Sequence, residues 1–138
     1  MTKIESKKLA VDEELFRNRV TAMGLGRMEK SFYYLHEIVA GQLARDYKRD
    51  DQPLTIPGIG VFNRKENYTK VATTLAARLK KSPRLTSLMQ SVMLAHGYTE
   101  AEVKRAITQY HIAVKDLGCF YVEGCFYIDA KHGFARYV

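Results

Sequence analysis

Seven basic side chains gather in one part of the chain, where they could bind a polyanion. The chain has 138 residues and a formal net charge of +7, and residues 64–84 hold nearly all of this excess, with Glu66 as their single acid. A concentrated positive field attracts polyanions, most often nucleic acid. The alternative is a solvated basic surface without a partner. The candidate DNA-binding residues are Arg64, Lys65, Lys70, Arg78, Lys80, Lys81 and Arg84.

The histidines and acids show no pattern typical of a catalytic or metal site. His96, His111 and His132 have no Cys, His or acidic neighbour at metal-ligand spacing, and His36 has only the adjacent Glu37. His111 lies beside an apolar stripe and is expected at the edge of the core. A phosphate-binding glycine loop, a Gly-x-Ser-x-Gly motif and a paired acidic motif are all missing from the sequence. We therefore expect a protein that is no enzyme and has neither cofactor nor metal.

The two cysteines, Cys119 and Cys125, flank a predicted hairpin turn. We interpret them as reduced, small hydrophobic residues, with a disulfide as the less favoured alternative. No apolar run approaches the roughly 20 residues that a membrane span needs, and the first residues lack the apolar core of a signal peptide. The expected location is the cytoplasm or nucleoid, or alternatively a virion, and no membrane contact is expected.

An internal repeat organises the elements that must position these residues. Residues 54–62 (LTIPGIGVF) and 120–128 (FYVEGCFYI) each read as two short apolar strands around a glycine-containing turn. Each follows a long amphipathic helix, over 28–47 and 100–117, and each long helix follows a shorter helical segment that ends near a glycine. The sequence therefore predicts the order helix, turn, helix, β-hairpin twice.

Local signals set the expected boundaries of these helices. Residues 1–11 are expected to form a flexible basic tail, and Asp12 to cap the first helix. Gly41, inside the second helix, is expected to permit close packing. Ser82 and Pro83 begin the third helix, and the pair Thr99 and Glu102 has the spacing of a capping box at the start of the last one.

The remaining segments are expected to be extended. A strand is predicted from Val61 to about Lys70, and residues 71–79 either pair with it or form a helix. FARYV at the end of the chain predicts a third strand after the second hairpin. The tyrosines at 33, 34, 121 and 127 could stack on bases or on a protein partner, but positions within helices and strands favour the core.

Three short motifs occur in a characteristic order along the chain. The first, Gly58-Ile59-Gly60-Val61-Phe62, is similar to the Gly-x-Gly-x-Phe turn and strand of the HU/IHF family of bacterial DNA-architectural proteins. Leu79-Lys80-Lys81-Ser82-Pro83-Arg84-Leu85 resembles the entry to the family's last helix, and Gly124-Cys125-Phe126 provides a second hairpin turn. The resemblance implies a tandem, single-chain variant: a tail over 1–11, one HU-like unit over 12–84 and a second over 85–138, packed as one compact domain.

The arms that grip DNA in the HU/IHF family are shortened here. About twenty residues separate the first hairpin turn from Pro83, and the chain has no Arg-Asn-Pro motif at an arm tip. In the family, that proline wedges between base pairs. Without an inserted wedge a protein does not unstack a base step, so the resemblance implies at most modest DNA bending.

The sequence thus predicts an α+β fold in which two HU/IHF-like helix–turn–helix–β-hairpin units form a pseudo-dimer. The predicted function is non-enzymatic, sequence-tolerant binding of double-stranded DNA through its phosphates, as in a histone-like, nucleoid-associated protein. The alternative is a structural or adaptor protein, such as a component of a phage virion or its assembly, whose hairpins and tyrosines contact protein subunits.

Overall fold

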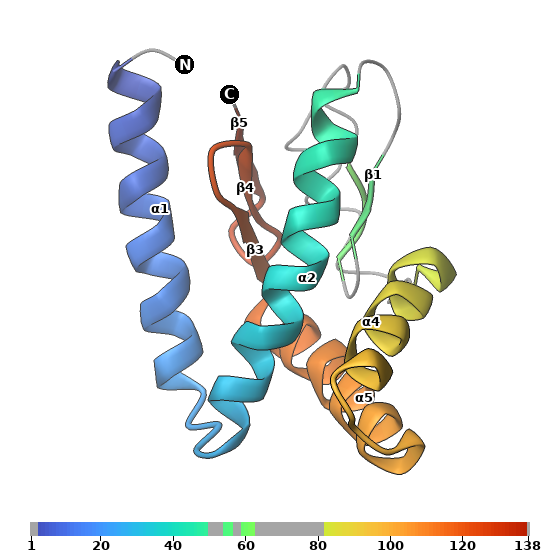
Figure 1. Ribbon diagram of the computed structural model, residues 1–138. Coiled ribbons are helices and arrows are strands. Elements are labelled where there is room, and N and C mark those ends of the chain that lie inside the picture. Colours follow the sequence, from blue (N-terminus) through green and yellow to red (C-terminus); the bar gives the residue numbers. More distant parts are fainter. Residues whose placement is uncertain (1–2, 50–53, 57–58, 63–81, 138) are drawn as a thin grey trace.

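The protein has an α+β fold in which helices surround a small antiparallel sheet (Figure 1). The computed structural model describes residues 3–49, 54–56, 59–62 and 82–137. In these residues the order helix, helix, hairpin occurs twice, as predicted. The elements are α1 (Lys3–Ala22), α2 (Met28–Lys48), β1 (Leu54–Ile56), β2 (Gly60–Phe62), α4 (Pro83–Ala95), α5 (Glu100–Leu117), β3 (Cys119–Val122), β4 (Phe126–Asp129) and β5 (Phe134–Tyr137).

The strands form two separate antiparallel sheets. β1 pairs with β2, so that Leu54 lies opposite Phe62. The second sheet has the order β3–β4–β5, and its last strand confirms the prediction for the C-terminal segment. Gly124 in the β3–β4 turn has a φ of +71°, a conformation that only glycine adopts without strain. The strands expected between residues 63 and 79 lie outside the described residues.

Helix α1 begins earlier than its sequence signals predict. It begins at Lys3, so the expected tail over residues 1–11 is helical from that point, and Asp12 does not cap the helix. Residues 3–11 contain no glycine or proline that would stop a helix. The Asp12 carboxylate is buried and accepts a bond from Arg136 Nε at 2.9 Å. The pairing of Asp12 with β5 therefore replaces the expected cap.

Helix α2 is the central element and contacts α4, α5, β1 and β3. Its predicted apolar stripe is confirmed, because Phe32, Leu35, Val39 and Leu43 are all buried. The expectation for Gly41 is wrong: the residue is exposed, and a Cβ added there would meet no atom of the described residues within 4 Å. No close contact between the described helices therefore depends on this glycine.

Helices α4 and α5 carry the caps that the sequence predicts. Ser82 accepts a bond from the Leu85 N–H at 3.3 Å, and Pro83 occupies the first turn of α4. Thr99 and Glu102 form the complete capping box of α5, with the Thr99 N–H donating to Glu102 at 3.0 Å. Gly118 ends α5 in the left-handed conformation. These boundaries depend on residues close in sequence, which explains why they are predictable.

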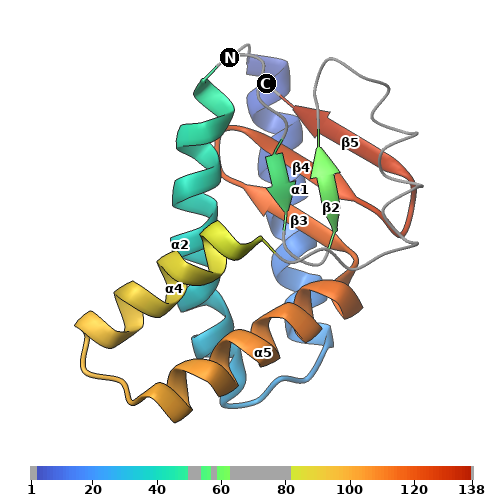
Figure 2. The same ribbon diagram turned by 90° about the vertical axis from the view of Figure 1, so that its right-hand side faces the viewer.

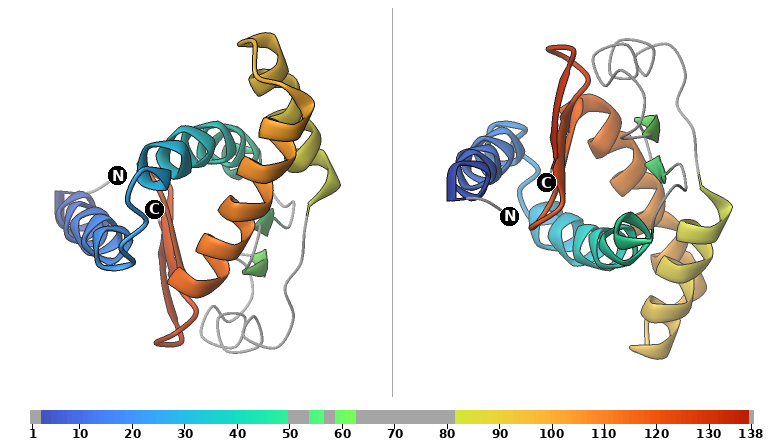
Figure 3. Two further views of the ribbon diagram at one scale, coloured as in Figure 1. Left: turned by 90° about the horizontal axis from the view of Figure 1, so that it is seen from below. Right: turned by 90° about the horizontal axis from the view of Figure 1, so that it is seen from above.

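The three-stranded sheet lies at the middle of the molecule. Figures 2 and 3 show α1 on one side of it and the β1–β2 hairpin on the other. Every residue of β3 and β4 is buried, as expected for strands that are covered on both faces. The largest fully buried side chains include Tyr110, Phe120, Phe126 and Tyr127, so aromatic rings fill much of this core.

The two halves share this core, but their first helices have different lengths and neighbours. Helix α1 has 20 residues and packs on β3 and β4 of the second half. Helix α4 has 13 residues and packs on α2 and α5. The repeat is therefore present in the order of elements, while α1 and α4 contact different kinds of partner.

Replacing Thr99 with alanine should lower the free energy of unfolding by roughly 1 kcal/mol, because the first-turn amides of α5 lose their side-chain acceptor. Urea denaturation measures this change. Thr108→Ala is the matched control: Thr108 is exposed inside the same helix, where alanine has the better helix propensity. Equal stability of the Thr99→Ala variant and the parent chain would contradict the role assigned to this cap.

Candidate nucleic-acid interface

Most of the predicted DNA-binding residues belong to one segment between β2 and α4. Six of them lie outside the described residues, and the structure therefore places only Arg84. This residue lies in the first turn of α4, two positions after the Ser82 cap, with an exposed side chain. The six others are Arg64, Lys65, Lys70, Arg78, Lys80 and Lys81.

Arg84 forms a two-pronged ion pair with Asp46 near the end of α2. Its Nη1 and Nη2 atoms donate to the two carboxylate oxygens at 2.8 and 3.1 Å, and Gln42 donates to the same group at 3.1 Å. Burial alone would raise the pKa of Asp46, but the bonds from Arg84 and Gln42 outweigh it and hold the pKa below its usual value. A phosphate must therefore compete with Asp46 for the Arg84 guanidinium.

This ion pair brings together the last turn of α2 and the first turn of α4. Arg45, Lys48 and Arg49 are exposed at the same end of α2; with Arg84 we call them the basic end. Arg45, Lys48 and Arg49 were not among the predicted site residues. Their clustering, three basic residues within five positions at the end of a predicted helix, was a signal in the sequence. Cations here also stabilise the helix through its dipole, whether or not they bind a ligand.

The tyrosines and cysteines considered as candidate contact residues lie in the core or at its edge. Tyr127 is fully buried and therefore not free to stack on bases, and Tyr121 is 8% exposed. Tyr34 is half-buried, and its hydroxyl lies 2.6 Å from His96 Nδ1. Cys119 and Cys125 are free, buried thiols, as predicted, and burial raises the pKa of both.

Among the described residues, no three His, Cys, Asp or Glu side chains are grouped as a metal site would require.

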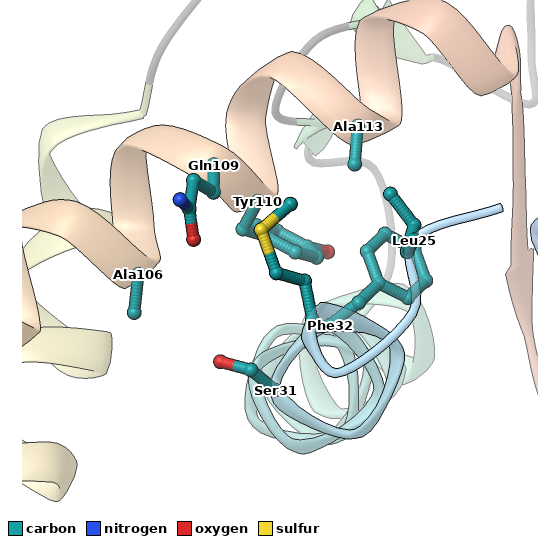
Figure 4. Close-up of a pocket in the computed structure, with 8 residues that line it drawn as sticks. Leu25, Ser31, Phe32, Ala106, Gln109, Tyr110 and Ala113 are labelled. Atoms are coloured by element: carbon teal, nitrogen blue, oxygen red, sulfur yellow. The ribbon is translucent and has the colours of Figure 1, made fainter. Parts of the chain in front are cut away.

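A small pocket lies between α2 and α5. Figure 4 shows a pocket between α2 and α5, where Phe32 and Tyr110 approach each other. Its volume is about 10 Å³, which is room for about one water molecule. This pocket lies at the surface, beside the exposed Met28, and is too small for a ligand.

His36 is a buried polar residue at the centre of the fold. Its burial was not predicted from the sequence. Its Nδ1 lies 3.1 Å from the Tyr110 hydroxyl, and its Nε2 lies 2.9 Å from the Tyr121 carbonyl oxygen. The carbonyl only accepts, so Nε2 carries the proton and Nδ1 accepts from the tyrosine. Burial lowers the pKa of His36 to about 4. The imidazole is thus neutral and fully bonded, which is a structural role.

A second buried cluster centres on Asp129 at the end of β4. Arg19 of α1 and the Tyr127 hydroxyl both donate to Asp129 Oδ2, at 2.9 and 3.0 Å, and the His132 N–H donates to Oδ1 at 3.1 Å. Burial would raise the pKa of Asp129, but the bonds from Arg19 and His132 outweigh it and lower the pKa. The cluster attaches α1 to the sheet.

The burial of Asp12 and His36 could have been inferred from their spacing in the sequence. Asp12 lies four residues before Phe16, and His36 lies four residues after Phe32, so each shares a face with a core residue. A polar residue on a buried face needs a partner. The partners themselves, such as Arg136 for Asp12, lie far along the chain and have no local signal.

Comparison of the chain with protein-family models, with curated proteins and with solved structures finds no match. No described helix has both the length and the apolar character that crossing a bilayer requires. The function is therefore inferred from the residues of this chain alone.

The stability of the protein should fall as the pH drops from about 6.5 to about 4. An unfolded histidine has a pKa of about 6.5, while that of His36 is about 4. The unfolded chain thus binds a proton that the folded chain excludes, at a total cost of roughly 3 kcal/mol. Urea denaturation at pH 7.0, 5.5 and 4.5 measures the decrease. In His36→Gln the pH dependence over this window should be much weaker; an unchanged dependence would assign it to other groups.

Proposed function

We propose that this protein binds double-stranded DNA without enzymatic activity and with tolerance for sequence. The observation that carries the proposal is the concentration of seven basic residues against one acid within residues 64–84. Lysine and arginine contacts to phosphate supply affinity without reading bases. Arg64, Lys65, Lys70, Arg78, Lys80, Lys81 and Arg84 are the proposed phosphate-neutralising residues.

The described residues support this proposal at the C-terminal end of residues 64–84, which we call the basic segment. Ser82 of this segment caps α4, and Arg84 lies in the first turn of that helix. The Arg84–Asp46 ion pair holds this point against the end of α2, where Arg45, Lys48 and Arg49 are exposed. We propose that the basic end extends the phosphate-binding surface from the segment onto α2.

We also propose that the chain is a tandem HU/IHF-like pseudo-dimer with shortened arms. The support is the repeated order of two helices and a hairpin around one core. In this proposal the second half takes the place of a second subunit, and modest bending follows because no proline is available at an arm tip. The expected location is the nucleoid.

The second candidate is an adaptor protein that binds protein subunits of a larger assembly, such as a virion. Two observations favour it. Arg84 already has a carboxylate partner, which reduces its value to phosphate. Leu94 and Tyr98, around the turn between α4 and α5, are large hydrophobic residues that are 46% and 41% exposed, a feature of protein contact surfaces.

Neutralising the basic segment should weaken binding to any DNA sequence. In Arg64→Gln/Lys65→Gln/Lys80→Gln/Lys81→Gln, the slope of log affinity against log salt should flatten by about 0.9 for each phosphate that the variant no longer neutralises. Fluorescence anisotropy with a labelled duplex over a salt series measures this slope. The matched control neutralises four exposed basic residues away from the basic end, Lys30, Lys104, Arg105 and Lys115, and should keep the parent slope. Absence of salt-sensitive binding at low ionic strength would exclude DNA and leave the adaptor function.

The pseudo-dimer proposal predicts one chain for each bound DNA site. Sedimentation of the protein with a duplex long enough for a single site measures the mass of the complex. One chain per duplex is expected, because both HU-like units lie in the same polypeptide. A complex that always contains two chains would contradict the pseudo-dimer and would leave the DNA proposal intact.

A further inference from the structure

A second cavity lies between α1, α2, β3 and the start of the β3–β4 turn. Its lining is aromatic and acidic, in contrast to the basic segment. Its volume is about 130 Å³. An apolar cavity of about 150 Å³ in another protein is known to admit benzene, so this one has room for a group of about five or six non-hydrogen atoms. Figures 1 and 3 show how α1 and α2 approach the sheet from two sides.

The inner wall of this cavity is aromatic and has no free hydrogen-bonding nitrogen. Phe16, Tyr33 and Tyr121 line it, together with His36. Both nitrogens of His36 are already bonded, to the Tyr110 hydroxyl and to the Tyr121 carbonyl. The wall can therefore hold an aliphatic stem or the face of a planar cation, and its histidine is not available as a base or metal ligand.

Carboxylates make the cavity acidic, in contrast to the chain as a whole. Glu13, Glu37 and Glu123 line it, against one basic residue, Arg17. Glu13 is bonded to Arg17 Nε at 3.3 Å. Glu37 and Glu123 are exposed, and within the described part of the chain neither has an ion-pair partner.

Two further observations indicate that this environment suits a cation. The Arg17 guanidinium lies over the Tyr33 ring, 5.3 Å from its centre, so a cation already stacks on the wall. Burial raises the pKa of Tyr121 to about 12, and Glu13, Glu123 and Asp12 add to this increase more than Arg17 offsets it. At Tyr121 the carboxylates thus outweigh Arg17, whereas at Tyr33 and His36 the positive charge of Arg17 acts to lower the pKa.

We propose that this cavity binds a cationic side chain, lysine or arginine, presented by a partner protein. The aliphatic stem of that side chain would lie against Phe16 and Tyr121, and its charge would pair with Glu37 and Glu123. Long basic side chains bind in this way, with the stem on apolar surface and the charged head in water. The proposal is independent of DNA binding, because none of the residues involved belongs to the basic segment or the basic end.

Short peptides test this directly. Three seven-residue Gly/Ser peptides, with lysine, arginine or glutamine at the central position, are titrated into the ¹⁵N-labelled full chain and followed by NMR. The lysine and arginine peptides should shift amide signals of the lining residues in a saturable way, and the glutamine peptide should not. Failure of both cationic peptides to do so would overturn the proposal.

Charge-matched variants make the test specific. Glu37→Gln/Glu123→Gln should weaken binding of the cationic peptides by about tenfold, the sum of two exposed ion pairs. Glu14→Gln/Asp116→Asn removes two exposed acids that do not line the cavity and should bind like the parent. Equal weakening in both double variants would reduce the effect to net charge and overturn the site.

Free n-butylamine distinguishes the proposed source of the cation from a small organic amine. The amine has the stem and charge of lysine without its backbone. Binding that is weaker than that of the lysine peptide supports a protein partner. Binding as tight as that of the peptide overturns the assignment to a protein. These titrations contain no DNA, so their outcome is separate from that of the DNA-binding experiment.

Discussion

The buried imidazole of His36 joins four elements of the fold. Its ring lies on α2, its two nitrogens bond to α5 and β3 through Tyr110 and Tyr121, and Phe16 of α1 packs against it with ring centres 4.9 Å apart. A buried polar ring is stable only when both nitrogens are satisfied. The positions of α5 and β3 relative to α2 are therefore restricted by the geometry of one side chain. The cavity between α1 and α2 and the wall of aromatic rings around it follow from this arrangement.

Buried acids impose a second constraint, because each holds the charged group of an arginine. Asp12 pairs with Arg136, and Asp129 pairs with Arg19. In both pairs a residue of α1 is joined to the C-terminal sheet, so the first helix of the chain is attached to its last strands. Breaking such a pair would leave an uncompensated buried charge, which costs far more than the pair contributes. These arginines thus serve the fold, and the proposed DNA surface depends on basic residues elsewhere.

Basic and acidic residues gather in different places on the molecule. The basic end brings Arg45, Lys48, Arg49 and Arg84 together at the junction of α2 and α4, where the basic segment ends. The cavity between α1 and α2, in contrast, is lined by Glu13, Glu37 and Glu123. The proposed contact to DNA and the proposed contact to a basic protein partner therefore use separate places on the molecule. The two proposals do not exclude each other.

Elements with local causes were predictable from the amino-acid sequence, whereas the polar contacts between them depend on packing. The stripe from Phe32 to Leu43 predicted α2, the pair Thr99 and Glu102 predicted the start of α5, and glycine turns between short apolar runs predicted the hairpins. In each case the responsible residues lie within about three helical turns or one hairpin, where spacing alone places them on one face or at one turn.

The polar contacts join residues that are far apart along the chain. The partner of Asp12 is Arg136, 124 positions away, and the partners of His36 lie 74 and 85 positions away. Asp12 therefore looked like a helix cap, since its sequence neighbours suit that role, and Arg84 looked like a free phosphate ligand because Asp46 is distant in sequence. Spacing along a chain reports which face a residue occupies, but the group that meets this face depends on how all the helices and strands pack.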